Sequence, residues 1–316
     1  MSRLPLVLLS LAMSVIAIPA PARAQAKTAA PGGGRLTLER IFGSNELRAL
    51  GTPSLRWSED GKGYTMLEPS SNGSDVRDIV RYDAATGRRE VVVRGDRLVA
   101  SGSGDALEIE DYELSPDGKR VLIFTNSARV WRQNTRGDYW VIDVKSGAPR
   151  KLGGAGAAPS TLMFAKFSPD GGRVAYVRAN NLYLEDVTSG AITPLTTDGS
   201  RTVINGTFDW GYEEELNLRD GFRWSPDGKR IAYWQLNDEG VRDFLLIDDT
   251  DSLYSFTIPV QYPKAGTTNS AGRVGVVSAS GGATQWLAVP GEPREHYIAR
   301  LEWAASSDEV VLQQLD

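Results

Sequence analysis

Hydrophobic and polar residues alternate in short stretches along most of the chain, and glycine-containing turns separate the stretches. Clear examples are the segments 79–83, 139–143, 182–187 and 273–277. Side chains of a β-strand point alternately to opposite faces, so strict alternation with short turns predicts antiparallel strands joined by hairpins. The pattern predicts an all-β protein.

A turn sequence precedes each alternating unit and repeats at a nearly constant spacing. It consists of an aromatic or aliphatic residue, Ser, Pro or Glu, Asp and Gly, and its serines are Ser58, Ser115, Ser168 and Ser225, spaced by 57, 53 and 57 residues. A degenerate copy follows after a longer gap of 79 residues, at Ala304. In such a turn Asp accepts hydrogen bonds from nearby backbone amides, and Gly adopts a positive φ. A period of about 55 residues with four antiparallel strands per unit predicts a β-propeller, of which five blades are visible.

The residue before each turn serine is expected to pack between blades. We therefore assign Trp57, Trp224 and Trp303 to the core rather than to a ligand-stacking role. The last segment, 310–316, stops within an alternating stretch. An open propeller leaves an unpaired sheet edge, which favours aggregation. We therefore expect residues 35–316 to be a partial propeller domain of a longer protein.

The N-terminus has the features of a targeting segment. An apolar run at 4–18 follows a basic residue, and the small-residue site Ala22-Arg23-Ala24 comes after it. These features predict a secretory signal peptide at 1–24, and residues 25–34 then form a flexible linker. The alternative is a membrane anchor, but the run is shorter than the ~18 residues that a spanning helix needs. We expect a bacterial periplasmic or secreted protein with no membrane association after cleavage.

Composition excludes several kinds of chemistry. The formal net charge of −5 and the lack of a basic block argue against nucleic acid as a partner. The chain has no Cys and one His, His296, so we expect no disulfide, thiolate nucleophile, multi-His metal site or cofactor. No G-x-S-x-G nucleophile elbow is present, and we expect no catalytic residue in this chain. His296 is expected to be a surface or packing residue.

An acidic and aromatic segment at 209–216, DWGYEEEL, does not recur in the repeat and is the first candidate for function. If it forms a short helix, adjacent carboxylates lie about 100° apart, so two of the glutamates 213–215 can converge on one cation. A primary ammonium offers three donors and suits such a pair. The alternative is a solvated helix start, where Glu interacts favourably with the helix dipole. The residues alone favour neither reading.

Arg132 is the second candidate. The segment 130–135, VWRQNT, interrupts the strand pattern of the second blade. An arginine after a tryptophan can present its planar fork to a carbonyl or carboxylate. The alternative is an ordinary surface ion-pair partner.

Three segments carry a resemblance to a known family. They are DWGYEEEL with RDGFRWSPDGKRIAYWQLND at 209–238, YPKAG with Asn269 at 262–269, and YIARLEW at 297–303. Together they resemble the N-terminal propeller of the dipeptidyl peptidase IV branch of the prolyl oligopeptidase family. The resemblance covers nearly all of residues 36–316, although Gly211 stands where a bulkier residue is usual. That departure is expected to loosen the glutamate segment slightly.

The resemblance implies an eight-bladed propeller that caps an α/β-hydrolase domain, which carries the Ser-Asp-His triad and is missing from this chain. It also implies that Glu214 and Glu215 bind the free α-ammonium of a peptide and that Arg132 contacts a carbonyl of its first dipeptide. The parent protein is then a serine dipeptidyl peptidase that releases X-Pro or X-Ala dipeptides, a homodimer at full length, and this chain alone is inactive. The alternative is a stand-alone secreted propeller that binds peptides or proteins without catalysis.

Overall fold

The computed structural model describes residues 36–48, 54–71, 76–100 and 104–316, so the predicted signal peptide and linker lie outside it. The chain divides into two compact units, residues 1–52 and 53–316. The described part of the first unit holds one helix, α1 (Leu38–Phe42), whose start is capped by the Thr37 hydroxyl. No helix within the described ranges is long and apolar enough to cross a membrane.

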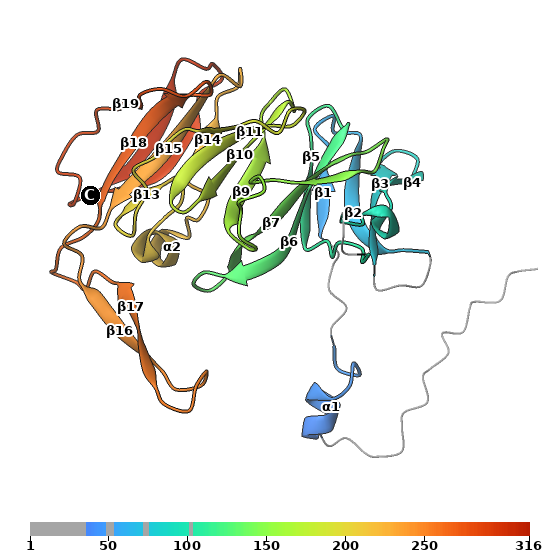
Figure 1. Cartoon of the computed structure of the whole chain (residues 1–316), viewed down its shortest axis with the longest axis horizontal. Coiled ribbons are helices and arrows are strands. Elements are labelled where there is room, and N and C mark those ends of the chain that lie inside the picture. Colours follow the sequence, from blue (N-terminus) through green and yellow to red (C-terminus); the bar gives the residue numbers. More distant parts are fainter. Residues whose placement is uncertain (1–35, 49–53, 72–75, 101–103) are drawn as a thin grey trace, which may run out of the picture. The chain divides into compact units, whose positions relative to one another are not determined.

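The second unit is built from antiparallel strands that follow one another in chain order (Figure 1). The first two blades comprise β1 (Leu55–Trp57), β2 (Gly63–Pro69), β3 (Arg77–Asp83) and β4 (Arg89–Val93), then β5 (Asp111–Leu114), β6 (Arg120–Arg129), β7 (Asn134–Asp143) and β8 (Pro149–Lys151). A 3-10 turn, η1 (Gly95–Arg97), lies between them. The third blade comprises β9 (Leu162–Phe167), β10 (Arg173–Arg178), β11 (Asn181–Asp186) and β12 (Ile192–Pro194).

The fourth blade comprises β14 (Phe222–Trp224), β15 (Arg230–Asn237), β18 (Ala271–Ser278) and β19 (Gln285–Trp286), with β13 (Val203–Asn205) beside β15. The fifth contributes two strands, β20 (Tyr297–Trp303) and β21 (Val310–Leu315). In addition β7 pairs with β9, which joins the second and third blades into one eight-stranded sheet. The predictions of an all-β fold and of four-stranded antiparallel blades are confirmed.

The repeated turns have the geometry that their sequence predicts. In the second blade the Asp117 Oδ1 accepts hydrogen bonds from the Lys119 N–H at 3.0 Å and from the Ser115 hydroxyl at 2.7 Å. Gly118 has a φ of 66°, in the left-handed region that glycine tolerates. The turns at Asp170 and Asp227 repeat the same bonds, so each serine and aspartate form one local unit.

An arginine two residues after the turn glycine couples the second, third and fourth blades to the blade that follows each of them. Arg120 donates a hydrogen bond to the Gly171 carbonyl at 3.1 Å, and Arg173 donates one to the Gly228 carbonyl at 2.6 Å. Arg230 donates one to the Asp308 carboxylate at 3.0 Å. In the first blade the same position is occupied by Gly63. The sequence repeat therefore encodes contacts between blades as well as turns within them.

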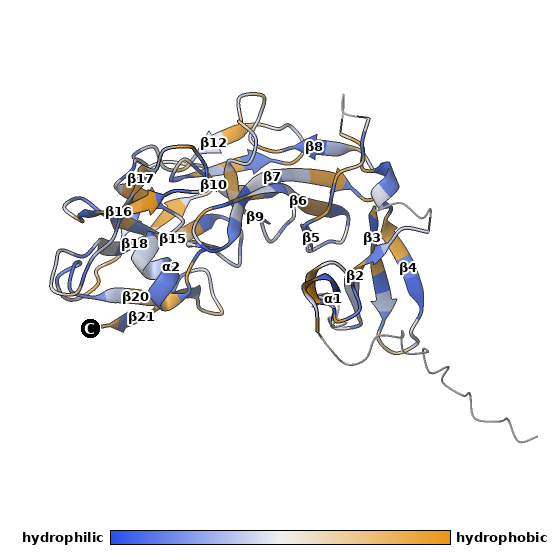
Figure 2. Cartoon of the chain, turned by 90° about the horizontal axis from the view of Figure 1, so that it is seen from below, coloured by the Kyte–Doolittle hydropathy of each residue, from blue (hydrophilic) through white to orange (hydrophobic). Residues whose placement is uncertain are grey.

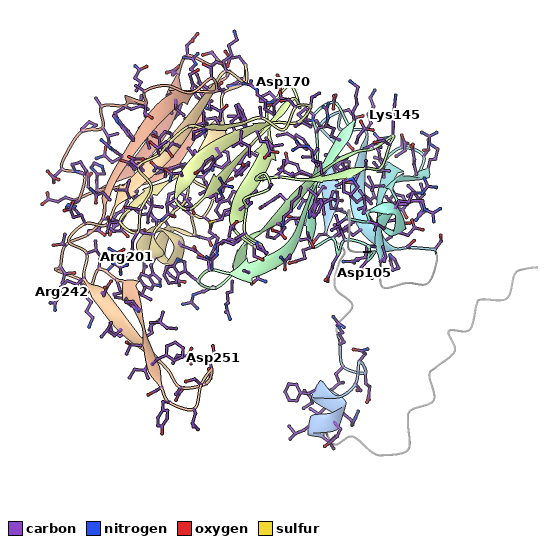
Figure 3. All side chains as sticks on the ribbon, viewed as in Figure 1. Asp105, Lys145, Asp170, Arg201, Arg242 and Asp251 are labelled. Carbon is purple, nitrogen blue, oxygen red and sulfur yellow. The ribbon has the colours of Figure 1, made fainter. Side chains whose placement is uncertain are left out.

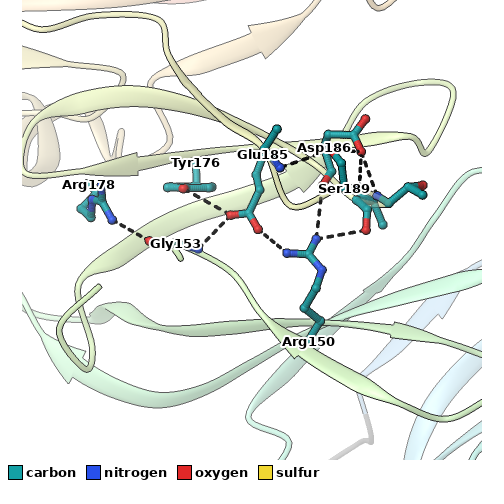
Figure 4. A network of polar contacts seen from close by, with 10 residues as sticks. Arg150, Gly153, Tyr176, Arg178, Glu185, Asp186 and Ser189 are labelled. Atoms are coloured by element: carbon teal, nitrogen blue, oxygen red, sulfur yellow. Dashed lines mark hydrogen bonds and ion pairs between the residues drawn. The ribbon is translucent and has the colours of Figure 1, made fainter. Parts of the chain in front are cut away.

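A buried carboxylate joins the outer strands of the second and third blades (Figure 4). Glu185 on β11 is 1% exposed and forms an ion pair with Arg150 of β8. Its second oxygen accepts hydrogen bonds from the Gly153 N–H at 2.8 Å and the Tyr176 hydroxyl at 3.4 Å. A buried charge needs such partners because losing one would leave the carboxylate unpaired in a low-dielectric interior.

The predicted role of the turn tryptophans is confirmed for two of the three. Trp303 is half-buried and donates to the Arg223 carbonyl at 3.1 Å, while the Arg173 guanidinium lies 5.5 Å from the ring centroid of half-buried Trp224. Trp57 is 64% exposed, so its assignment to the core is wrong. Trp57 lies on β1, an edge strand of the first blade, where no preceding blade covers it among the described residues.

A hairpin inserted between β15 and β18 explains the longer spacing before the last turn motif. Its strands are β16 (Asp243–Asp248) and β17 (Phe256–Gln261), which pair only with each other among the described strands. Figure 2 shows apolar residues along these strands, and many of them are exposed: Phe244, Leu245, Leu246, Ile247, Phe256 and Ile258, with Leu253 and Tyr254 in the turn. Figure 3 shows Asp251 at the far end of this hairpin.

Candidate functional site

The acidic segment forms helix α2 (Trp210–Leu216), between β13 and β14. Asp209 caps its start: Oδ1 accepts from the Tyr212 N–H at 2.8 Å, and Oδ2 accepts from the Ser270 hydroxyl at 2.6 Å. Asn217 ends it in the left-handed conformation, with a φ of 57°. A seven-residue helix is not stable by itself, so its ends and its packing must hold it in place.

Tyr212 fixes α2 to the fourth and fifth blades. The side chain is 1% exposed, and its hydroxyl accepts a hydrogen bond from the Ile298 N–H at 3.2 Å. Its ring stacks on Phe208, with centroids 5.5 Å apart. A Cβ on Gly272 would lie 2.6 Å from the tyrosine oxygen, so only glycine allows this approach. The glutamates therefore stand on a helix with one defined orientation.

The three glutamates occupy three different environments. Glu213 is buried and accepts from the Arg219 Nε at 3.2 Å. Burial raises the pKa of its carboxyl, and Arg219 opposes that rise. The side chain of Glu214 is 13% exposed, and Glu215 is exposed. Glu214 and Glu215 are therefore more accessible to a ligand than Glu213 is.

The structure brings Arg132 and Glu214 together although 82 residues separate them. Arg132 lies on the turn between β6 and β7, and its Nε is 2.7 and 2.6 Å from the two carboxylate oxygens of Glu214. The arginine side chain is 74% exposed, and in the described part of the chain its hydrogen bonds come from Nε alone. An exposed ion pair of this kind contributes at most about 1 kcal/mol, so a ligand can rearrange it at low cost. The terminal amino groups keep their donors for an external acceptor.

Glu215 lines a cavity of about 350 Å³, whose other walls include Trp210, Gly211, Tyr262 and Lys264. A Cβ on Gly211 would meet its nearest neighbours at 3.8 and 3.9 Å, which is ordinary contact. Gly211 therefore leaves room in this wall, and the expected loosening is opposed by the caps at both ends of α2.

A second cavity of about 350 Å³ lies on the other side of α2, bounded by the β6–β7 turn and by β17. It contains Asp238, a residue that the sequence analysis did not single out. Asp238 is 3% exposed, and its Oδ1 has no hydrogen-bond partner. Burial, and next the charge of Asp209, raise the pKa of this carboxyl to about 8. The Asn237-Asp238 pair at the end of a strand resembles an ordinary turn sequence, so nothing in the local sequence identifies Asp238 as a buried site residue.

Neither a metal cluster nor a histidine-centred site stands out in the described residues. No group of three or more His, Cys, Asp or Glu side chains there could hold a metal ion. His296 is 2% exposed, and neither ring nitrogen has a hydrogen-bond partner. It is a packing residue, as expected.

The propeller blades carry an acidic helix, α2, whose Glu214 contacts Arg132 on the β6–β7 turn. Known proteins with similar sequences and folds identify the class to which this propeller belongs. The family model of the dipeptidyl peptidase IV N-terminal region matches residues 115–316, and the chain belongs to this family. The structure superposes on the crystal structure of Porphyromonas gingivalis dipeptidyl peptidase 4 with a TM-score of 0.79 and 27% identity. That match covers 90% of this chain and 39% of the other, and it shows the propeller fold.

Curated relatives point the same way. The chain is 31% identical over 228 residues to dipeptidyl aminopeptidase B of Saccharomyces cerevisiae, covering 70% of this chain and 27% of that one. It is 27% identical over 282 residues to inactive dipeptidyl peptidase 10 of Rattus norvegicus, covering 88% and 34%. The chain thus spans about a quarter to a third of the length of these relatives. The roles predicted for Glu214, Glu215 and Arg132 stay predictions.

Proposed function

We propose that this propeller binds the free N-terminus of a peptide and presents it to the catalytic domain of a serine dipeptidyl peptidase. The observation that carries the proposal is the Arg132–Glu214 pair, which joins two separately predicted site residues across 82 residues of sequence. The α-ammonium of the peptide binds Glu214 and Glu215, and the free donors of Arg132 bind a backbone carbonyl. An ammonium held at a fixed distance from a nucleophile limits cleavage to the bond after the second residue.

The relatives' names support the reaction class, since dipeptidyl aminopeptidase B is named for releasing dipeptides. We propose that the parent protein releases X-Pro and X-Ala dipeptides and that residues 36–316 alone are inactive. Loss of one carboxylate of the clamp removes a charge-assisted contact to the substrate. Because such contacts are worth about 2–5 kcal/mol when truncated, kcat/KM should fall by more than tenfold.

The test uses the full-length protein with Glu214→Gln, Glu215→Gln and Arg132→Met, and Glu292→Gln as a control at an exposed loop position. The readout is kcat/KM for a free-amine X-Pro substrate and for its N-acetylated form. We expect the three site variants to lose activity on the free amine selectively, with the control unchanged. Equal cleavage of blocked and free substrates, with normal variants, would refute the clamp.

A second function is favoured by one comparison. A relative that matches 88% of this chain is named an inactive dipeptidyl peptidase, so the family contains propellers whose parent protein does not cleave. In that case the protein binds peptide N-termini without chemistry. Binding of an X-Pro peptide with no hydrolysis at full length would favour this function over the first.

We also propose that the protein is exported through its predicted signal peptide and is a homodimer at full length. The exposed apolar strands β16 and β17 support association, because a large apolar surface on a soluble protein marks a contact site. N-terminal sequencing of the mature protein should begin at Gln25. Sedimentation should show a dimer that Ile247→Asp converts to a monomer, and a monomeric wild type would refute it.

A further inference from the structure

The cavity that contains Asp238 has the components of a cation site. Its walls include Trp131 of the β6–β7 turn, Trp210 of α2 and Val260 of β17. Arg201, labelled in Figure 3, also lines this cavity. Aromatic faces attract cations and also pack against alkyl chains. The cavity therefore combines apolar and aromatic walls with charged and polar groups, a mixture that can hold a ligand with an alkyl stem and a charged end.

Most charged groups around this cavity already have a partner within the protein. Arg201 pairs with Asp243, and Glu213 pairs with Arg219. Both oxygens of Asp209 accept hydrogen bonds, from Tyr212 and Ser270. These groups hold the structure in place and need no ligand.

Asp238 differs from them because its carboxyl is buried and unsatisfied. Its backbone is held directly after β15 by a 2.8 Å hydrogen bond from its N–H to the Thr202 carbonyl. The side chain is 3% exposed and its Oδ1 has no partner. A buried acceptor without a partner costs about 1–3 kcal/mol, and native proteins keep few of them.

We propose that this cavity binds the cationic side chain of a peptide, with the ammonium or guanidinium on Asp238 and the alkyl stem between Trp131 and Trp210. A cation would satisfy the carboxyl and fill the apolar walls at once. Arg136 and Arg201 also line the cavity, and their charges oppose binding, as does that of Arg294 near Asp238. The ligand must therefore bring a flexible stem that places its charge at Asp238. The proposal does not rest on the proposed function, since it needs neither Glu214 nor Glu215.

The protonation of Asp238 agrees with this assignment. Burial and Asp209 raise the pKa of the carboxyl to about 8, while Arg294 and Arg201 oppose the rise. Without a ligand the group is therefore largely protonated at neutral pH. A bound cation favours the carboxylate, so binding releases a proton and tightens as the pH rises toward 8.

The test titrates the full-length protein with Nα-acetyl-lysine methylamide, which has no α-ammonium and so cannot use the proposed clamp. The norleucine analogue supplies the same stem without the charge, and ammonium chloride supplies the charge without the stem. The readout is the indole N–H signals of the tryptophans by NMR, with Asp238→Asn compared to Glu239→Gln, its exposed neighbour.

We expect the lysine compound to bind about ten- to a hundredfold more tightly than the norleucine compound, as a hydrogen bond to a charged group implies. Asp238→Asn should abolish this preference without lowering the melting temperature, and Glu239→Gln should retain it. The proposal is overturned if the two compounds bind alike, if neither binds, if ammonium binds as tightly as lysine, or if Asp238→Asn keeps the preference. These results are independent of whether blocked substrates are cleaved.

Discussion

Replacing Asp209 by Ala should show how strongly the start of α2 depends on one side chain. The change removes the acceptor for the Tyr212 N–H at 2.8 Å, and loss of a helix cap of this type costs about 1 kcal/mol. It also leaves the Ser270 hydroxyl without its acceptor at 2.6 Å. Ser270 is 1% exposed, and a buried unsatisfied donor costs about 1–3 kcal/mol.

The two losses together predict a destabilisation of about 2–4 kcal/mol for Asp209→Ala. Asp209→Asn keeps the carbonyl oxygen that caps the helix, and its amide can donate to the serine oxygen. We therefore expect Asn to lose less than about 1 kcal/mol. The alanine variant should also lose peptide binding, because Glu214 and Glu215 stand on the helix that it weakens.

Urea denaturation followed by tryptophan fluorescence measures both variants, with the shift in midpoint as the readout. Asp249→Ala, at an exposed position of the hairpin, serves as a control and should stay within about 0.5 kcal/mol of wild type. The reasoning is refuted if Asp209→Ala is as stable as the control, or if Asn costs as much as Ala.

Two further predictions concern the blades. Arg173→Met removes a 2.6 Å hydrogen bond to the Gly228 carbonyl and a contact with the Trp224 ring, so the free energy of unfolding should fall by about 1–2 kcal/mol. The urea midpoint should fall accordingly, and an unchanged midpoint would show that the coupling between blades lies elsewhere. Asp238 has a folded pKa of about 8, above its unfolded value, so its stabilising contribution is present below about pH 4 and is lost as the pH rises to 8. Asp238→Asn should therefore gain stability relative to wild type between pH 5 and pH 8 in thermal unfolding, and a constant difference would contradict the buried-carboxyl assignment.

The blades and their turns could be predicted from sequence because their determinants are local. The Ser-Pro-Asp-Gly turn specifies its own hydrogen bonds within six residues, and alternation specifies which face of a strand is buried. The sequence raised a helix at 209–216 only as a condition, and the structure shows that Asp209 caps it. The positions of Arg132 and Glu214 were predicted separately, but their pairing depends on how two blades pack.

Other features could not be predicted because they depend on contacts distant in sequence. The hairpin strand DFLLID at 243–248 has consecutive apolar residues, so alternation gives no signal for a strand exposed on both faces. Trp57 has the same local motif as Trp224, and only the neighbouring blade distinguishes an exposed tryptophan from a packed one.

The arginine contacts between blades also impose an order on biosynthesis. Each arginine bonds to a blade made later, at sequence separations of 51, 55 and 78 residues for Arg120, Arg173 and Arg230. During translation a completed blade therefore has no bond at this arginine until the next turn has left the ribosome. Closing a longer loop costs more entropy, and the segment between Arg230 and its acceptor contains the inserted hairpin. Of the three contacts, the one at Arg230 therefore has the largest entropic cost of formation. Translational pausing within residues 243–261 would lengthen the time for which the fourth blade waits for its neighbour.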